Sequence, residues 1–501
     1  MRDSPINSIK IIGYYIGKVI IVLSFIQIIP ILTSIIYREW NIVINFVTSM
    51  SIALIIGSLL VIACKTTTKR KISWSNGMII AAFSWFSGML LCAVPYYLSG
   101  NYKSYLDSCF DVMSGFTTTG LVLIHNLDHV SNGINMWRHM LTYLGGQGMI
   151  VLALTFLVKS TSGSYRMYVG EAKDEQLLPN VTSTARAIWY ISTVYLIFGT
   201  ITLWIIGIII GIPADRAFLH GLWVFMAAWS TGGFAPQSQN ILYYHSLWYE
   251  LATVIFFVIG SFNFALHYAV WNRNRKEIIK NIEIISMSIT TAVLTVLTVV
   301  GLMKLNVYPD FMATFRKCFY LLISCHTTTG FMTIYAKQFY NEWGNIALFG
   351  VIVAMLIGGS ACSTAGGFKG LRMGIIFKGF IRDVRRILIP ESKVQIDKFH
   401  HIGDTLLEER HVRSAMLIVL AYIATFAIGT LAGVFFGYPL SSAAFESASV
   451  TGNVGLSAGI TQASMPNTLK IVYITIMWLA RLEFMSVFAL FAYIFYGARR
   501  K

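Results

Sequence analysis

Long apolar stretches make up most of the chain. Nine of them are long enough to cross a membrane, because about 20 helical residues span the hydrocarbon of a bilayer. A tenth, residues 343–380, is interrupted by glycines and indicates two half-spans. The chain is therefore expected to fold as an all-α polytopic membrane protein. The nine full-length spans are expected at residues 11–36, 43–64, 75–98, 136–158, 187–211, 247–271, 282–304, 413–437 and 468–496.

The composition excludes several other classes. Charged residues make up 12% of the 501 residues, against the usual quarter in a soluble domain, and 56% are hydrophobic. This excludes a soluble enzyme, a disordered chain and a disulfide-stapled secreted domain. The six cysteines are scattered without a CxxC pair, so they indicate neither a metal site nor a disulfide framework. We find no nucleotide-binding or acyl-transfer motif, and we expect that the chain is not an enzyme.

The formal net charge of +16 is concentrated beside the apolar stretches. Cations cluster at 65–74, 272–281 and 378–413, where anionic cytoplasmic lipid retains them. With an even number of spans, both termini are expected in the cytoplasm. The first stretch is longer than a signal-peptide core, so we expect no cleaved leader. Membrane lipid, rather than nucleic acid, is the partner that this pattern predicts.

Four shorter apolar stretches lie between the spans, and 10–14 apolar residues are typical of re-entrant segments. Each ends in a turn rich in hydroxyl groups and glycine, and the glycines at 120, 232, 330 and 452 recur about every hundred residues. This predicts four pseudo-symmetric helix–pore loop–helix repeats around a central ion pore. The short stretches are Tyr105–Phe116, Ala217–Trp229, Met312–Cys325 and Ser441–Val450, and their turns are 117–120, 230–234, 327–331 and 450–455.

The repeat divides the chain into five parts. An N-terminal transmembrane helix pair occupies 1–72 and lies outside the repeats. The four repeats are expected at 73–165, 166–280, 281–398 and 399–501, all beginning from the same side of the membrane. An ordinary secondary transporter with inverted repeats is an alternative that this parallel order disfavours.

Four polar turns at membrane depth are tolerated only if protein buries them or water bathes them. Converging on one axis, their carbonyl oxygens can replace the hydration shell of a monovalent cation, as in potassium-channel filters. Glycine allows the required backbone conformations, and threonine hydroxyls can add ligands. We expect a monovalent cation as the transported ion, with no covalently bound cofactor. The predicted filter residues are Thr118, Thr119, Gly120, Ser230, Thr231, Gly232, Thr328, Thr329, Gly330, Val450, Thr451, Gly452 and Asn453.

Several further motifs carry a resemblance to a known family: 136–139 with 144–146, 263–268, 358–367 and 478–483. With the four turns, they make the chain resemble the Trk/Ktr/HKT superfamily of potassium transporters, in its TrkH-like branch. The resemblance implies potassium uptake at the inner membrane by a homodimer, regulated by a cytosolic nucleotide-binding subunit of the TrkA type. In plant relatives a serine in the first turn accompanies sodium transport, so Gly120 favours potassium.

The chain also departs from the family pattern. Ala361 and Cys362 stand where glycine or serine is expected, His326 precedes the third turn, and Ala480 replaces a glycine. These departures leave the ion-binding backbone intact and make gating details less transferable.

The side chains of residues 358–367 are unusually small for a membrane span. Each glycine costs about 1 kcal/mol in a helix relative to alanine. The segment is either a kinked, closely packed helix or, as the resemblance implies, an intramembrane loop that blocks or opens the pore below the filter. The predicted gating residues are Gly358, Gly359, Ser363, Thr364, Gly366, Gly367 and Lys369, with Arg481 from the last span.

Arg481 lies near the middle of the expected span 468–496, where a charge is costly unless it faces protein or water. It either binds neighbouring carbonyls or lines the pore below the filter as an electrostatic barrier. Glu483, two positions away, is not an obvious partner on one helix. Lys369 and Arg372 are expected at the cytoplasmic end of the loop.

Two polar features leave alternatives open, Glu446 and the basic loop 378–413, and a histidine pair lies within that loop. Glu446 either braces the filter by accepting backbone N–H groups or is a solvated acid at the outer mouth. His400 and His401 lack the spacing of metal ligands. The basic loop 378–413 either faces lipid or docks a soluble subunit.

Besides a secondary transporter with inverted repeats, potassium uptake has two further rivals within this sequence. The same scaffold could conduct sodium or couple K⁺ to Na⁺ or H⁺ in a symport mode. A membrane-embedded enzyme would need convergent titratable groups, and chiefly one arginine is present at membrane depth.

Overall fold

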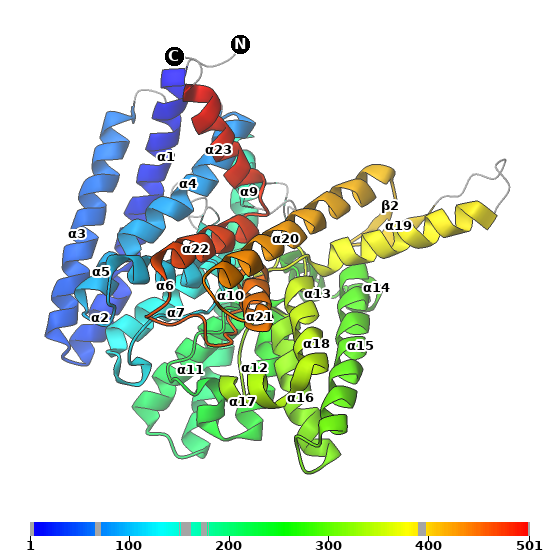
Figure 1. Ribbon diagram of the computed structural model, residues 1–501. Helices are drawn as coiled ribbons and strands as arrows, with labels where there is room; N and C mark the ends of the chain where they lie inside the picture. Colours follow the sequence, from blue (N-terminus) through cyan, green and yellow to red (C-terminus); the bar gives the residue numbers. More distant parts are fainter. Residues whose placement is uncertain are drawn as a thin grey trace.

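The computed structural model describes residues 5–65, 72–149, 151, 162–171, 178, 180–388 and 397–498. These residues are mostly helical, and the strands among them form a single antiparallel hairpin, β1 (Lys398–His400) with β2 (Asp404–Leu406). The expected all-α polytopic membrane fold is confirmed (Figure 1). Shorter helices are α9 (Ser162–Gly170), α14 (Glu277–Lys280), α17 (Ala336–Glu342), η2 (Leu127–His129) and η3 (Asn240–Tyr244).

Six of the described helical stretches are long and apolar enough to cross a membrane without a sharp bend. Their outer faces carry large apolar side chains: Ile55, Leu59 and Ile62 on α3 are each at least 60% exposed, as contact with lipid requires. The six are α1 with α2 (Pro5–Ile26 and Ile28–Ile36), α3 (Trp40–Ala63), α4 with α5 (Trp74–Cys92 and Val94–Leu98), α10 (Val181–Ile209), α15 (Ile282–Leu305) and α20 (Glu409–Phe435).

Two expected spans are broken, so the prediction of continuous helices at 247–271 and 468–496 is wrong. The first bends by 100° between α12 (Leu247–Gly260) and α13 (Phe264–Trp271), and the second by 116° between α22 (Asn467–Arg481) and α23 (Met485–Ala498). At the second break Glu483 and Phe484 have φ values of +48° and +68°, a left-handed conformation that ends a right-handed helix. Hydropathy cannot detect either break, because apolar residues continue on both sides.

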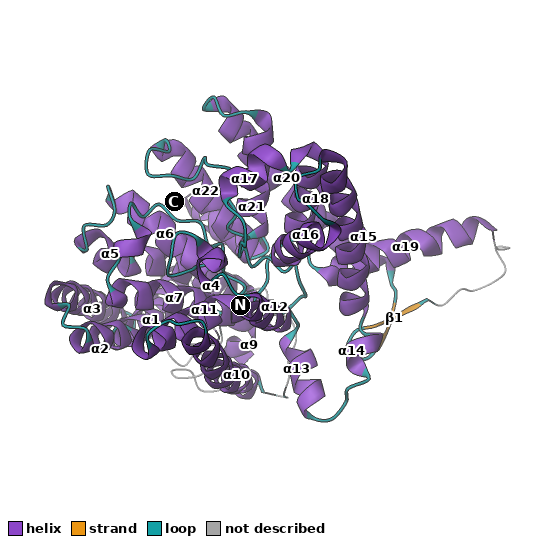
Figure 2. Ribbon diagram, turned by 90° about the horizontal axis from the view of Figure 1, so that it is seen from below, coloured by secondary structure: helices purple, strands orange, loops and turns teal. Residues whose placement is uncertain are grey.

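Two more of the expected membrane stretches, 136–158 and the glycine-interrupted 343–380, also differ from a simple span. The stretch 136–158 begins as α7 (Asn132–Gln147), and most of its remainder lies outside the described residues. The stretch 343–380 is interrupted where its glycines indicated: α18 (Gly344–Ile357) is followed by residues 358–369 without helix and then by α19 (Gly370–Leu388). We call residues 358–369 the intramembrane loop. Beyond it, α19 projects from the side of the molecule (Figures 1 and 2).

Four half-helices occur where the short apolar stretches predicted them: α6 (Tyr105–Phe116), α11 (Ala214–Trp229), α16 (Phe311–His326) and α21 (Leu440–Gly452). Each packs between the helix before it and a helix after it: α4 and α7, α10 and α12, α15 and α18, α20 and α22, respectively. The pair α1 and α3 lies at one edge (Figure 1). The domain boundaries themselves stay a prediction.

Candidate ion-conduction site

The four half-helices end in the same way. At each C-terminus a backbone N–H donates to the carbonyl five residues earlier, and the residue before that donor has a positive φ. This is the Schellman-type termination, which satisfies carbonyls that the helix end would leave unpaired. The N–H donors are Thr119, Gly232, Thr329 and Val454, with N···O distances of 2.7, 2.8, 2.8 and 2.9 Å, and the positive-φ residues are Thr118, Thr231, Thr328 and Asn453.

Three of those left-handed residues are threonines. A β-branched residue rarely adopts positive φ, and such strain costs on the order of 1–3 kcal/mol. Thr118, Thr231 and Thr328 have φ values of +56°, +50° and +59° and are fully buried. The surrounding packing therefore holds three strained residues at equivalent positions, which is typical of functional sites.

The four turns meet in a closed ring. Each turn continues into a glycine of positive φ, and a Cβ on that glycine would collide with a backbone carbonyl of the next turn. Only glycine fits at such a close approach. The clashing pairs are Gly120 with Gly232 O, Gly233 with Thr329 O, Gly330 with Val454 O, and Gly455 with Thr119 O, which returns to the first turn.

A side chain also links the last turn to the first, because the Asn453 Nδ2 donates to the Thr119 Oγ1 at 3.0 Å. Above the ring lies a cavity of about 160 Å³, whose lining includes all four ring glycines, 120, 233, 330 and 455. The half-helices direct their C-terminal ends, which carry partial negative charge, toward this ring. The arrangement is suited to hold a cation.

The ring corrects the predicted register of two turns. The prediction aligned Gly232 and Gly452 with Gly120 and Gly330, but Gly233 and Gly455 occupy those positions. The second turn contains two adjacent glycines, and the prediction chose the earlier one.

In the fourth turn, Val450, Thr451 and Gly452 still belong to α21. The counterparts of Thr118, Thr119 and Gly120 there are Asn453, Val454 and Gly455. The predicted turns 230–234 and 450–455 contain Gly233, Val454 and Gly455, but the list of predicted filter residues left these three out. Asn453 tolerates the left-handed conformation and precedes a glycine by two positions, which was the signal available in the sequence.

The intramembrane loop lies directly against the ring. The Thr364 Oγ1 is 3.2 Å from the Thr231 Oγ1, and the Thr118 Oγ1 is 3.5 Å from the Thr364 carbonyl oxygen. The Gly366 N–H donates to the Thr328 Oγ1 at 2.9 Å, and a Cβ on Gly366 would meet the Gly452 carbonyl. The loop therefore contacts all four turns, and it touches three of them at the strained threonines.

Backbone hydrogen bonds join the two ends of the intramembrane loop. The N–H groups of Phe368, Lys369 and Gly370 each donate at 2.8 Å to the carbonyls of Leu356, Ile357 and Gly359. Gly358 and Gly367, both of positive φ, pack backbone against backbone at this neck. Ser363 donates to the Ser360 carbonyl at 2.7 Å within the loop. The alternative of a kinked continuous helix over 358–367 is therefore wrong.

Arg481 contacts both the loop and the ring. Its Nη1 donates to the Thr364 carbonyl at 2.5 Å and lies 3.3 Å from the Thr118 Oγ1. Its Nη2 donates to the carbonyls of Gly145 and Gly146 at 2.9 and 3.3 Å. Arg481 is the last residue of α22 at the bend, not the middle of a continuous helix. This position brings the guanidinium under the first turn.

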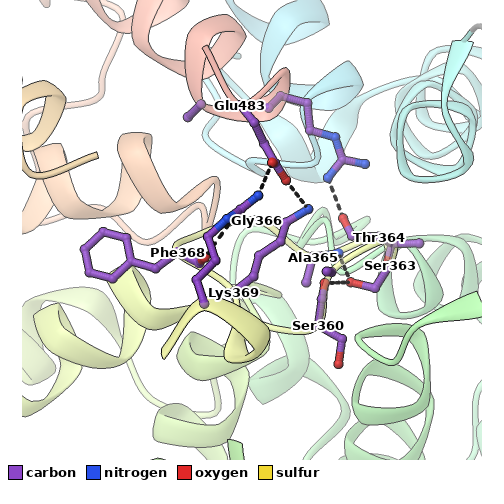
Figure 3. A network of polar contacts seen from close by, with 12 residues as sticks. Ser360, Ser363, Thr364, Ala365, Gly366, Phe368, Lys369 and Glu483 are labelled. Atoms are coloured by element: carbon purple, nitrogen blue, oxygen red, sulfur yellow. Dashed lines mark hydrogen bonds and ion pairs between the residues drawn. The ribbon is translucent and has the colours of Figure 1, made fainter. Parts of the chain in front are cut away.

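Glu483 is a residue of the site that the sequence interpretation missed. Its carboxylate binds the Lys369 Nζ at 2.7 Å and also the Arg372 guanidinium (Figure 3). Both cations are largely buried, with side chains 8% and 14% exposed. The bend after Arg481 turns Glu483 toward the end of the loop, and a continuous helix could not do this.

Glu446 is completely buried near the fourth turn. It accepts the backbone N–H groups of Ile460 and Thr461, each at 3.0 Å, and the hydroxyls of Ser457 and Thr461. Glu446 accepts backbone N–H groups as the bracing alternative expected, but these belong to the segment after the turn and not to the filter itself. The solvated-acid alternative is wrong. Among the described residues, no group of three or more His, Cys, Asp or Glu is arranged to hold a metal ion.

Comparison with known proteins identifies the family. A family model described as TrkH, cation transport protein, matches residues 42–284 and 278–496. The chain belongs to this TrkH family. An uncharacterized cation transporter of Methanocaldococcus jannaschii is 28% identical over 99% of this chain and 98% of its own length. The Trk system potassium uptake protein TrkG of Escherichia coli is 26% identical over 98% of this chain and 99% of its own length.

A solved structure supports the same assignment. The crystal structure of the potassium transporter TrkH from Vibrio parahaemolyticus matches with a TM-score of 0.81 and 25% identity, over 97% of this chain and 98% of that one. The resemblance to the TrkH branch is thereby confirmed. Because these relatives are transporters, the expectation that the chain is not an enzyme is also confirmed.

Proposed function

We propose that this protein takes up K⁺ across the cytoplasmic membrane through the ring of four turns. The observation that carries the proposal is the closure of the ring: four half-helix ends meet at glycines 120, 233, 330 and 455, with a cavity on one side. Carbonyl oxygens of these turns, rather than charged side chains, replace the hydration shell of the ion. The relatives named as potassium uptake proteins support K⁺ as the ion, and no bound cofactor is needed.

The intramembrane loop is the proposed gate. It lies against all four turns on the side of Arg481, so an ion leaving the ring would meet the loop and a guanidinium. Opening requires the loop to give up its hydrogen bonds to Thr328 and Arg481. Of the two alternatives for Arg481, carbonyl binding and an electrostatic barrier, the geometry supports both at once, because the same guanidinium does the binding and carries the charge.

The orientation and the partners are parts of the same proposal. We place the cation-rich segments 272–281 and 378–413 and both termini on the cytoplasmic face of the inner membrane. The exposed apolar side chains on the projecting α19, with Ile387 and Leu388 at least 80% exposed, support a homodimer with part of its contact there. We include a TrkA-like nucleotide-binding subunit among the partners because the chain belongs to the TrkH family.

The test is ion flux through the purified protein in liposomes. The wild type is expected to pass K⁺ in preference to Na⁺, and Gly233→Ser is expected to reduce this preference while Gly100→Ser does not. Gly100 also has a positive φ, but its Cβ would meet open space, so it controls for backbone strain alone. Equal K⁺ and Na⁺ flux in the wild type would contradict the proposal. Reversal potentials under imposed Na⁺ or H⁺ gradients distinguish uncoupled flux from symport.

A further inference from the structure

The β1–β2 hairpin brings two histidines onto the junction between the second and the third repeat. The His400 Nε2 lies 3.0 Å from the Glu277 Oε2 on α14, and its Nδ1 lies 2.7 Å from the Asp404 Oδ1. The Ile402 N–H also donates to the Glu277 Oε1 at 3.0 Å. The hairpin thus attaches to α14 mainly through one carboxylate and one imidazole.

Glu283 connects the hairpin to the intramembrane loop. It lies in the first turn of α15 and is 1% exposed. Its Oε1 accepts the N–H of Ala361 in the loop at 2.6 Å, and its Oε2 lies 3.8 Å from the His401 Nδ1. One buried carboxylate therefore binds a backbone group of the proposed gate and lies beside an imidazole of the hairpin, whose nearer partner is the Asn281 Oδ1 at 3.5 Å.

The charges around the two imidazoles have mixed signs. Carboxylates hold the imidazoles directly, whereas the nearby lysines act on the hairpin backbone and on Asp404: the Lys378 Nζ donates to the Lys398 carbonyl. The charged groups around the hairpin are Glu277 and Lys280 on α14, Glu283 on α15, Lys378 on α19, and Lys398 and Asp404 on the hairpin itself.

Hydrogen bonds to Asp404 and Glu277 raise the pKa of His400 above its ordinary value. A raised pKa means that the folded hairpin favours the protonated imidazole. The resulting stabilisation is complete below the ordinary pKa of histidine and is lost as the pH rises through the raised pKa. The hairpin is therefore held most firmly at acidic pH.

We propose that this histidine hairpin senses pH on its side of the membrane and transmits it to the intramembrane loop through Glu283. At acidic pH the protonated His400 holds Glu277, the hairpin keeps His401 beside Glu283, and Glu283 keeps the loop against the ring. At alkaline pH the hairpin loosens and the loop is released more often, so that ion flux increases. The inference rests on the proposed function, in which the loop obstructs the ring.

The experiment is a K⁺ current or flux measurement in a bilayer where each side has its own buffer. On the hairpin side the pH is varied from about 6 to about 8, and the other side is kept constant. The wild-type flux is expected to increase at least about fivefold over this range, the lower end of common couplings between sites. The double variant His400→Gln with His401→Gln is expected to lose this dependence and to keep the alkaline flux throughout.

Two further variants separate sensing from damage to the fold. In His411→Gln the wild-type pH dependence is expected to remain, because His411 belongs to the capping box of α20 and glutamine can serve the same acceptor role. In Glu283→Gln the amide oxygen still accepts the Ala361 N–H but cannot pair with a charged His401, so the dependence is expected to weaken.

The outcomes distinguish the two proposals. If the wild type passes no K⁺, the proposed function fails and this inference fails with it. If K⁺ flux is normal but is independent of pH on the hairpin side, or retains its dependence in the double histidine variant, the pH-sensing hairpin alone is overturned.

Discussion

The ring and the intramembrane loop are built from the same small residues but are held in different ways. In the ring, glycines approach carbonyls of neighbouring turns so closely that a Cβ has no space, and the half-helix ends fix each turn through backbone hydrogen bonds. The contacts between the loop and the ring mostly involve a side chain, of Thr364, Arg481 or Thr328, and the end of the loop is held by Lys369 bound to Glu483. Backbone hydrogen bonds join the two ends of the loop and also join Ser360 to Ser261.

This difference separates a rigid part from a movable one. Deforming the ring would require several backbones to shift together, because interiors packed at this density transmit strain instead of absorbing it. Releasing the loop requires its hydrogen bonds to the turns, to Arg481 and to Ser261, together with one ion-paired cluster, to exchange partners. Substitutions in the ring are therefore expected to change which ion passes, whereas substitutions around the loop are expected to change how much passes.

The largest effect is expected from Gly330→Ala, which tests the rigid part. The new Cβ would collide with the Val454 carbonyl, and the positive φ of +78° would be strained in addition. We expect the preference for K⁺ over Na⁺ to decrease by at least about tenfold, which corresponds to about 1.4 kcal/mol. Reversal potentials in mixed K⁺ and Na⁺ solutions measure this preference.

Gly437→Ala is the control for this prediction, because Gly437 has a φ of +86° and open space around it. An unchanged ion preference in Gly330→Ala, with the protein correctly folded, would show that the ring does not select the ion.

The next effect is expected from Glu483→Gln, which tests how the loop is held. Removing this carboxylate leaves Lys369 and Arg372 largely buried without their shared counterion. Breaking a buried ion pair on one side costs about 3–5 kcal/mol. We expect K⁺ flux to increase about tenfold and the thermal unfolding temperature to fall, with ion preference unchanged. A lower unfolding temperature without increased flux would assign Glu483 to stability alone.

The sequence predicted this contrast only in part. Half-helices and turns were predictable, because short apolar stretches followed by hydroxyl groups and glycine have few other solutions inside a membrane. The register of the second and fourth turns was not, because Gly232–Gly233 and the segment 450–455 each offer more than one glycine to align. Backbone contacts between turns decide the register, and these contacts are far apart in the chain.

The ion cluster at Glu483 was unpredictable for another reason. A continuous helix over the 29 residues 468–496 would place Arg481 and Glu483 on different faces. The bend of 116° removes that constraint and directs both side chains to the loop. Left-handed residues such as Glu483 and Phe484 leave no reliable mark in hydropathy.

Substitutions of Arg481 separate charge from bonding, and the expected effect is smaller. Arg481→Ala removes the donors to Thr364, Gly145 and Gly146 and also the positive charge, so we expect flux to increase about fivefold. Arg481→Lys keeps the charge but cannot make the forked set of bonds. Flux near the wild-type level in Arg481→Lys would identify the barrier as electrostatic. Unchanged flux in Arg481→Ala at equal expression would remove both roles.

The smallest effect is expected from Thr364→Val, which changes one hydroxyl of the loop and almost no volume. The Thr364 Oγ1 lies 2.8 Å from the Gly260 carbonyl and 3.1 Å from the Trp229 carbonyl, so the hydroxyl ties the loop to the second repeat. A hydrogen bond of this kind contributes about 1 kcal/mol, and we expect flux to increase about two- to threefold with unchanged ion preference. Thr475→Val is a matched control, because the Thr475 hydroxyl binds only a carbonyl of its own exposed helix turn. If Thr364→Val changed the ion preference instead of the flux, loop and ring would form one rigid unit, and the separation between a selecting part and a movable part would not hold.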